Sequence, residues 1–253
     1  MEAALPSGLR LYAIGDVHGC HSALTAIHHL IRSDLAARPV PEWRVLHLGD
    51  YIDRGPDSRA VVVTLRAKSQ DPRWVCLRGN HDQYLIDVLE SPGNSDLINW
   101  ISNGGSATLV AYGMAPVDTI SLGDPAARLR LCSEVIAAVP DDHRAFLRAL
   151  PYSARFGGYL FVHAGIRPGR PIGAQDPHDL MWIRRAFLNS TEDHGAVVVH
   201  GHSVVDRVER HPNRIAIDTG AVFGGSLSCL VLEAGYEAVL TGDGPVPLEA
   251  VWD

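Results

Sequence analysis

The sequence predicts an α/β fold built on two β-sheets. In the first half of the chain, a short apolar segment is followed three times by a polar loop and then by apolar residues at helical spacing. Strand-loop-helix units of this kind indicate a parallel sheet. In the second half, apolar segments follow one another with few helices between them, which indicates a second sheet packed against the first.

The first strand is predicted at residues 9–14 and ends in the motif Gly15-Asp16-Val17-His18-Gly19. Apolar residues then recur every three or four positions from Leu24 to Leu35, which predicts a helix directly behind this motif. We expect the helix to end at residues 38–41, because a residue that precedes proline disfavours helical geometry.

The second unit has its strand at residues 44–48, which lead into Gly49-Asp50-Tyr51-Ile52-Asp53-Arg54-Gly55, and its helix begins near Ser58. The third unit has its strand at residues 74–77, followed by the polar loop Arg78-Gly79-Asn80-His81-Asp82. A strand that ends in Gly-Asp delivers its carboxylate to the carboxyl edge of the sheet, where ligands of open α/β folds bind. The second motif is therefore the centre of the predicted site.

The strand-loop-helix pattern is interrupted at about residues 91–151. The clearest helix in this part is predicted at residues 141–150. We interpret this part as a helical insertion that shapes a substrate cleft, and none of its residues looks catalytic. The chain has no linker and no repeat of fixed period, and the motifs of its two halves must converge. We therefore expect one domain that spans residues 1–253.

Strands return after the insertion. They are predicted at residues 159–162, ending in His163-Ala164-Gly165, at 196–199, ending in His200-Gly201-His202, at 214–217, ending in Asp218-Thr219-Gly220, and at 227–232. All four are assigned to the second sheet.

Composition excludes several classes of protein. The net charge of -7 argues against general affinity for nucleic acid, which usually requires a basic face. There is no run of eighteen apolar residues and no basic, apolar leader at the start, so we expect a cytoplasmic protein without a membrane partner. The four cysteines lack C-x-x-C spacing, which argues against a zinc knuckle or a redox pair.

Five predicted strands end in aspartate, asparagine or histidine. Taken singly, Asp16 suits a helix cap, Asn80 a turn and His163 a core position. Together, their oxygens and nitrogens are the donors that Mn, Fe, Zn and Ni prefer. Burying so many polar groups without partners would be costly, whereas shared metal ions would satisfy them. The sequence therefore predicts a metal site.

The number of donors favours two ions. There are six candidate ligands, more than one catalytic ion needs: Asp16, His18, Asp50, Asn80, His163 and His202. Asp50 is the natural bridge between the ions. Two ions about 3.5–4 Å apart lower the pKa of a bridging water and stabilise an in-line displacement at phosphorus. Arg54 and Arg184 are candidate phosphate ligands, because a guanidinium can hold two phosphate oxygens.

The motifs at residues 15–19, 49–55, 79–82, 163–165 and 201–202 resemble the motif series of the calcineurin-like metallophosphoesterases. Within that family the sequence is similar to bacterial serine/threonine phosphoprotein phosphatases. The resemblance extends from about residue 9 to residue 232. It implies a four-layer sandwich in which two central β-sheets are flanked by helices.

The resemblance also implies roles for single residues. One metal would be held by Asp16, His18 and bridging Asp50, and the other by Asp50, Asn80, His163 and His202. The catalytic residues would be His81, as general acid, Asp53, which hydrogen-bonds His81, and Arg54 and Arg184, which grip phosphate; Arg185 is the neighbouring alternative. His200 is expected to support the ligands rather than to be one.

Two features bear on the substrate. Protein phosphatases of this type usually have Glu where Asp82 stands, and Asp is found in the related diadenosine tetraphosphate hydrolases. The intact Asp53-Arg54-Gly55 instead favours the phosphoprotein branch. A metal-dependent serine/threonine protein phosphatase is therefore the leading hypothesis, with Mn as the favoured metal.

The main alternative is a hydrolase of diadenosine tetraphosphate or a related nucleotide. A phosphate sensor without turnover is disfavoured because His81 and Asp53 are both present. A nuclease is disfavoured by the acidic charge balance. The expected partner is a phosphoprotein or a small phosphoester, and not a nucleic acid.

Overall fold

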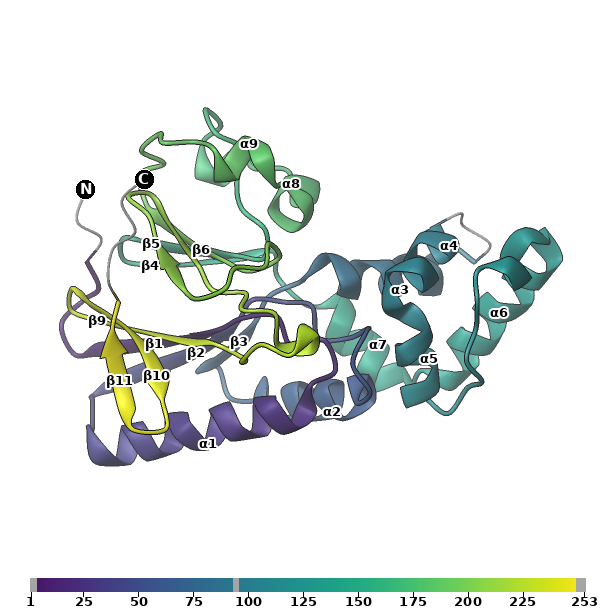
Figure 1. Cartoon of the computed structure of the whole chain (residues 1–253), viewed down its shortest axis with the longest axis horizontal. Helices are drawn as coiled ribbons and strands as arrows, with labels where there is room; N and C mark the ends of the chain where they lie inside the picture. Colours follow the sequence, from purple (N-terminus) through teal and green to yellow (C-terminus); the bar gives the residue numbers. More distant parts are fainter. Residues whose placement is uncertain (1–3, 93–95, 249–253) are drawn as a thin grey trace.

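Two mixed β-sheets form the centre of the computed structural model, which describes residues 4–92 and 96–248. One sheet has six strands in the order β11-β10-β9-β1-β2-β3, and the other has five in the order β4-β5-β6-β8-β7. Helices cover the outer face of each sheet (Figure 1). The predicted α/β class, with two central sheets flanked by helices, is confirmed.

The first sheet contains the three predicted βα units. Its strands β1 (Leu9–Ile14), β2 (Glu42–His47) and β3 (Trp74–Cys76) are parallel, and α1 (His21–Ala37) and α2 (Ser58–Lys68) connect them. Ile14 pairs with His47, and His47 pairs with Cys76. The loops that follow these three strands therefore leave the same edge of the sheet at the same level.

The strand predicted at residues 227–232 belongs to the first sheet, so its assignment to the second sheet is wrong. It forms β9 (Cys229–Glu233), which runs antiparallel to β1 with Cys229 opposite Ile14. The strands β10 (Tyr236–Thr241) and β11 (Gly244–Pro247) extend this side. Because β9 is antiparallel, its first residue lies beside the last residue of β1, close to the loop that follows β1.

The second sheet has three parallel strands, β5 (Tyr159–Val162), β6 (Val197–His200) and β8 (Arg214–Ala216). The edge strands β4 (Ser153–Phe156) and β7 (Glu209–Arg210) run antiparallel to their neighbours. The short helices α8 (Pro177–Trp182) and α9 (Arg185–Leu188) lie over the outer face of this sheet (Figure 1).

Alternation of side chains along β1 explains the layers. Tyr12 and Ile14 point into the apolar core under α1 and α2, whereas Leu11 and Ala13 point into the core between the two sheets. A third core, which includes Phe187, lies between the second sheet and α8 and α9. Helices, sheet, sheet and helices therefore form four layers.

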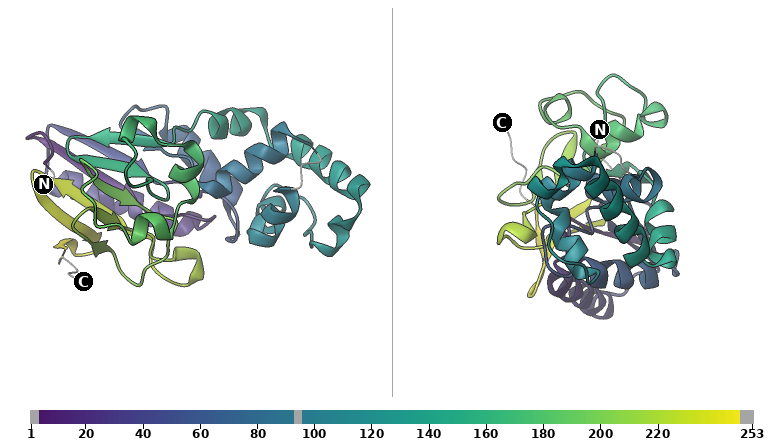
Figure 2. Two further views of the ribbon diagram at one scale, coloured as in Figure 1. Left: turned by 90° about the horizontal axis from the view of Figure 1, so that it is seen from above. Right: turned by 90° about the vertical axis from the view of Figure 1, so that its right-hand side faces the viewer.

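Most of the chain between β3 and β4 is helical and extends to one side of the sheets (Figures 1 and 2). Its helices are α3 (Asn80–Glu90), α4 (Asp96–Trp100), α5 (Ser106–Ala111), α6 (Pro125–Ala138) and α7 (Asp141–Arg148), with a π-helical turn η1 (Ile101–Gly105) and a 3₁₀ turn η2 (Ile120–Gly123). Within the described residues, no helix has the length and apolar character needed to cross a membrane.

The third polar loop is shorter than predicted. Helix α3 begins at Asn80, so Asn80, His81 and Asp82 form its first turn, and only residues 77–79 separate it from β3. The side chain of Asp82 accepts the Gly79 N–H, which satisfies a backbone donor at the start of the helix. The helix thereby fixes Asn80 and His81 on a rigid element.

Candidate metal centre

The six expected ligands come together where loops of the two sheets meet. Asp16 and His18 follow β1, Asp50 follows β2 and Asn80 begins α3, while His163 follows β5 and His202 follows β6. All six side chains are buried. Each lies against at least one of the others, so the structure joins donors from both halves of the chain in one cluster.

Asp50 is the centre of this cluster. Its Oδ2 atom lies 3.3 Å from Nε2 of His18, and its Oδ1 atom lies 3.4 Å from Nε2 of His163. Two groups of possible metal donors, with atoms within 4.8 Å of one another, both include Asp50; one adds His18 and His81, and the other adds His163 and His202. Asp50 is therefore placed to serve two neighbouring ions.

The histidine tautomers leave lone pairs that face Asp50. The Nδ1 atoms of His18 and His163 lie 2.8 Å and 2.9 Å from the backbone oxygens of Ile52 and Leu48. A carbonyl oxygen only accepts hydrogen bonds, so each Nδ1 carries the proton and each neutral ring has its lone pair on Nε2. A lone pair that faces a carboxylate is repelled by it, and a shared metal ion would remove this repulsion, as at metal-binding histidines.

Two of the atoms of the expected ligands have no hydrogen-bond partner in the described part of the chain. Oδ1 of Asp16 and Nε2 of His202 are buried without a hydrogen bond in the described part of the chain. A side chain at residue 201 would overlap Oδ1 of Asp16, so Gly201 leaves this oxygen free. Oδ1 of Asn80 lies 2.8 Å from Nε2 of His163. Unpaired buried donors of these types fit divalent cations.

The charge states also suit cation binding. Burial lowers the pKa of His18 to about 3 and that of His202 to about 2, so both rings are neutral at pH 7. Burial alone would raise the pKa of Asp50, but His163 and the other surrounding histidines hold it below its usual range. Neutral imidazoles and an ionised carboxylate are the forms that bind metals.

Asp53 and His81 form a buried pair beside these donors. Oδ2 of Asp53 lies 2.7 Å from Nδ1 of His81. Burial alone would lower the pKa of His81, but Asp50 and the hydrogen bond with Asp53 raise it above its usual value. The protonated form of His81 is therefore more favoured than that of a free imidazole.

The helical region supplies two residues that sequence reasoning missed. Nε1 of Trp100 donates to both oxygens of Asp53, at 3.0 Å and 2.9 Å, and Oγ1 of Thr108 donates to Oδ1 at 2.6 Å. Trp100 and Thr108 are 47 and 55 residues beyond Asp53, so no local spacing connects them to it. They fix the carboxylate that in turn fixes His81.

The two expected phosphate-binding arginines are both exposed but differ in their contacts. Nη1 of Arg54 lies 2.6 Å from Nε2 of His18, and the Arg54 backbone N–H donates to the oxygen of Gly104 at 3.1 Å. Among the residues that the structure describes, Nη1 of Arg184 contacts only Oγ of Ser203, at 3.5 Å. Arg54 is therefore already directed at the cluster, whereas Arg184 lies at its margin.

Asp82 holds the loop that carries Asp50 in place by accepting hydrogen bonds from its backbone. Its Oδ2 atom accepts the N–H groups of Asp50 and Gly79 at 2.9 Å each, and its Oδ1 atom accepts that of Tyr51 at 3.0 Å. Burial and the nearby Asp50 raise the pKa of Asp82 to about 8. The side chain is fully buried, and both of its oxygens are used by backbone N–H groups.

Asp218 and His200 also lie at strand ends, although neither was expected to be a metal ligand. Asp218, which was not singled out from the sequence, is buried beside Asp16; after burial itself, it is the strongest cause of the raised pKa of Asp16. The ring of His200 packs against Phe187 of α9, with centroids 5.1 Å apart. Neither donor group found in the described residues includes His200.

Aromatic rings border the cluster on the side of His81. The Tyr84 ring lies 5.9 Å from the His81 ring, and the Trp182 ring lies 5.1 Å from Tyr84, both edge to face. Trp182 also lies 6.4 Å from His202. These two half-buried rings form a wall next to the buried donors.

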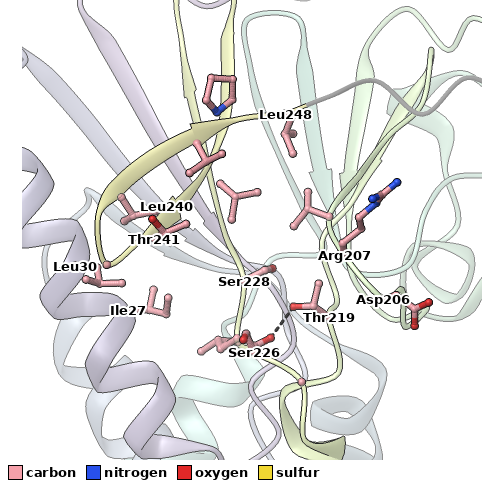
Figure 3. Close-up of a pocket in the computed structure, with 17 residues that line it drawn as sticks. Ile27, Leu30, Asp206, Arg207, Thr219, Ser226, Ser228, Leu240, Thr241 and Leu248 are labelled. Carbon is pink, nitrogen blue, oxygen red and sulfur yellow. Dashed lines mark hydrogen bonds between the residues drawn. The ribbon is translucent and has the colours of Figure 1, made fainter.

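A cavity of about 1000 Å³ lies elsewhere, between α1, the β10–β11 hairpin and the loop between β8 and β9 (Figure 3). Several of its polar groups bond to the protein itself: Oγ1 of Thr219 donates to the Ser226 oxygen at 2.6 Å, and Oγ of Ser228 donates to the Ile217 oxygen. None of the six expected metal ligands lines this cavity.

Comparison with known proteins identifies the family. The family model described as calcineurin-like phosphoesterase matches residues 9–242. The chain belongs to the calcineurin-like phosphoesterases. The family identity agrees with the four layers and with the cluster of donors at the strand ends.

Two kinds of named relative resemble this phosphoesterase. Serine/threonine-protein phosphatase 1 of Salmonella typhimurium is 30% identical over 230 residues, which cover 86% of this chain and 89% of the relative. A symmetrical bis(5'-nucleosyl)-tetraphosphatase of Methylobacillus flagellatus is 28% identical over 271 residues, covering 88% and 91%. A tetraphosphatase of Methylococcus capsulatus is 27% identical over 278 residues, covering 90% and 94%.

Solved structures support the fold of this phosphoesterase. A putative diadenosine tetraphosphatase superposes with a TM-score of 0.62 at 20% identity, covering 96% of this chain and 98% of the other. A cold-active protein-tyrosine phosphatase of a psychrophilic Shewanella superposes with a TM-score of 0.64 at 16% identity, covering 98% and 84%. At these identities the likeness concerns the fold alone.

Proposed function

We propose that this phosphoesterase is a serine/threonine protein phosphatase that depends on two divalent metal ions, most simply Mn²⁺, and works in the cytoplasm. The observation that carries the proposal is the buried pair of Asp53 and His81, whose 2.7 Å contact is held by Trp100 and Thr108. A positioned, protonated histidine suits the release of a poor leaving group such as the alkoxide of serine or threonine.

The proposed ligands divide into two sets that share Asp50. Asp16 and His18 complete the first set, and Asn80, His163 and His202 complete the second. When bound, two such ions supply Lewis-acid stabilisation of charge at phosphorus and lower the pKa of water. The unpaired atoms of Asp16 and His202 support this division, since each set gains one donor that has no other partner.

Of the remaining residues, His81, Arg54 and Arg184 act on the substrate, and Asp53 acts through His81. His81 gives its proton to the leaving oxygen, and Asp53 orients His81 and stabilises its charged form. Arg54 and Arg184 bind the non-bridging phosphate oxygens. Arg54 lies against Nε2 of His18 in this structure, so it would have to turn away if that nitrogen held a metal, and a bound phosphate would offer the guanidinium a new partner.

Two observations favour a phosphomonoester of a protein over a dinucleotide. A relative that is 30% identical over 86% of this chain is named a protein phosphatase. The alignments with the two tetraphosphatases run over 271 and 278 residues, more than the 253 residues of this chain, so those relatives contain segments that this chain lacks. A terminal phosphate dianion also gains more than an internal phosphoryl group from two guanidinium groups.

Hydrolysis of diadenosine tetraphosphate is the second candidate function. It is favoured by the number of relatives with the tetraphosphatase name, several of which are 24–28% identical across 88–90% of this chain. Asp82 does not add to this case. Its carboxylate is occupied by three backbone N–H groups, so an aspartate at this position acts on the loop and not on the substrate.

A substrate panel tests the proposal. The Mn²⁺-loaded protein is assayed with phosphoserine and phosphothreonine peptides, diadenosine tetraphosphate and an aryl phosphate, and the His81→Asn variant controls for contaminating phosphatases. We expect kcat/KM to be highest for a phosphopeptide. A value for diadenosine tetraphosphate well above that of every peptide in a broad panel would overturn the proposal in favour of the second function.

A further inference from the structure

Phe223 is the only aromatic ring among the large apolar side chains that are exposed in the described ranges, with 64% of its surface accessible. It ends η4 (Ala221–Phe223), a 3₁₀ turn in the loop after β8. Exposed apolar residues are common singly, but an exposed ring beside a functional site has a stronger claim to a binding role.

The loop holds Phe223 outward by its own hydrogen bonds. The N–H groups of Phe223 and Gly225 donate to the oxygen of Gly220 at 2.8 Å and 3.1 Å. Gly220 and Gly224 have φ values of 67° and 95°, which favour glycine, and a side chain at Gly225 would overlap the Thr219 oxygen. The ring is therefore exposed on a tightly bonded turn.

Val204 lies beside Phe223 although it comes from a different loop, the one that follows β6 and carries His202. A Cβ atom placed on Gly220 would lie 3.1 Å from Cγ1 of Val204 and 3.7 Å from Cδ2 of Phe223. Val204 is itself 54% exposed. Two separate loops thus present one apolar surface, which we call the Phe223–Val204 patch.

Arg54 connects this patch to the metal centre. Its guanidinium carbon lies 5.4 Å from the centre of the Phe223 ring, and its Nη1 lies 2.6 Å from Nε2 of His18. In this structure the exposed ring of Phe223 is therefore separated from the buried donor His18 by a single side chain. Neighbouring Cα atoms of a peptide are about 3.8 Å apart, so the residues directly next to a phosphorylated one are those held nearest to a surface beside the metal centre.

We propose that the Phe223–Val204 patch is a subsite for an apolar side chain directly adjacent in sequence to the phosphorylated residue of a protein substrate. The inference rests on the proposed protein phosphatase function and adds a sequence preference to it. An apolar side chain gains free energy by covering two exposed apolar groups, whereas a small polar side chain gains little.

The test compares phosphopeptides that differ only in the residue before or after the phosphoserine, with leucine or serine there. We expect the native protein to favour the leucine peptide in one position by about tenfold in kcat/KM, the effect of one partly buried leucine. The Phe223→Ser and Val204→Ser variants should each reduce this ratio to about threefold or less. Because the ratio compares two substrates on one variant, a general loss of activity cancels.

Ile120→Ser is the matched control. Ile120 is 90% exposed in η2 of the helical region, so the change removes an exposed apolar side chain outside the patch. Its peptide ratio should equal that of the native protein. Thermal unfolding of all variants establishes that they are folded.

The outcomes separate the two proposals. If peptides are cleaved but the native ratio is near one, or is unchanged in Phe223→Ser, the subsite is refuted and the phosphatase function stands. If no peptide is cleaved and diadenosine tetraphosphate is, the function itself is refuted. A Phe223→Ser variant that raises only the KM for diadenosine tetraphosphate would make the ring a stacking surface for a base and would overturn the peptide subsite.

Discussion

Oδ2 of Asp53 lies 2.7 Å from Nδ1 of His81, and both side chains are buried. The contact determines which nitrogen of His81 faces the metal centre, because Nδ1 is occupied and Nε2 is left for the substrate. His81 also lies across from His18, with ring centroids 4.7 Å apart. One hydrogen bond therefore sets both the direction and the charge of the proposed proton donor.

Replacement of His81 separates proton donation from metal binding. We expect His81→Asn to keep the metal content of the native protein and to lower kcat by roughly 10²–10⁴, the usual effect of a lost general acid. The defect should be smaller with a nitrophenyl phosphate, whose leaving group needs no proton, than with an alkyl phosphate. Equal losses on both substrates, or loss of metal, would contradict the assignment.

The pH dependence of kcat should contain the titration of His81. Burial opposes its charge, but Asp50 and the hydrogen bond with Asp53 raise its pKa above the usual value, so the proton is retained to higher pH than on a free imidazole and is lost as pH rises through the raised pKa. Asp53→Asn removes one negative partner and should move the basic limb of the profile to lower pH. An unmoved limb would mean that another group controls it.

Asp50 is expected to control binding of both ions. Asp50→Asn keeps the shape of the side chain but removes the charge that faces His18 and His163, so both sites should lose affinity together. Elemental analysis after dialysis should find far less than two metals per chain, with activity lost in parallel. A variant that still binds two ions would contradict the bridging role.

Arg54 is expected to bind phosphate as a fork rather than as a point charge. Arg54→Ala should raise KM and lower kcat for phosphoserine peptides, and Arg54→Lys should recover little, because an ammonium group makes no bidentate contact. Arg66→Ala, at a half-buried arginine of α2 that pairs with Asp142, controls for loss of a positive charge. Full recovery by lysine would refute the forked contact.

Asp82 is expected to act on stability and not on substrate choice. Asp82→Ala leaves the N–H groups of Asp50, Tyr51 and Gly79 without their acceptor. An unsatisfied buried donor costs about 1–3 kcal/mol, so the free energy of unfolding in urea should fall by several kcal/mol. Asp82→Glu should leave the ratio of peptide to dinucleotide activity unchanged, and a switch of that ratio would contradict this reading.

The strand ends could be predicted from the sequence because a run of apolar residues and the polar motif that follows it are next to each other in the chain. Residues 9–14 and their motif needed no distant information, and the recurrence of donor residues after successive strands predicted that Asp16, Asp50 and His163 would meet. The assignment of β9 failed for the opposite reason. An apolar run of this length fits either sheet, and only pairing with β1 decides which one.

The residues that hold the catalytic side chains in place could not be predicted from sequence patterns. Trp100 reads as an ordinary core residue of a helical segment, and its contact with Asp53 depends on how that segment folds back over the central loop. In the sequence, Asp82 pointed to a dinucleotide substrate, but its three hydrogen bonds to backbone N–H groups indicate a structural role. Contacts between residues far apart in the chain, without a repeated motif, leave no signal in one sequence.

The donor set that joins Asp50 to His163 and His202 crosses from one sheet to the other, and the space between these sheets is filled by side chains such as Leu46 and Phe161. The separation of the donors is therefore set by the thickness of an apolar layer. Trimming a buried ring in that layer would change the distance between groups that it never touches. The distances between the donor groups therefore depend on how the core between the two sheets is packed.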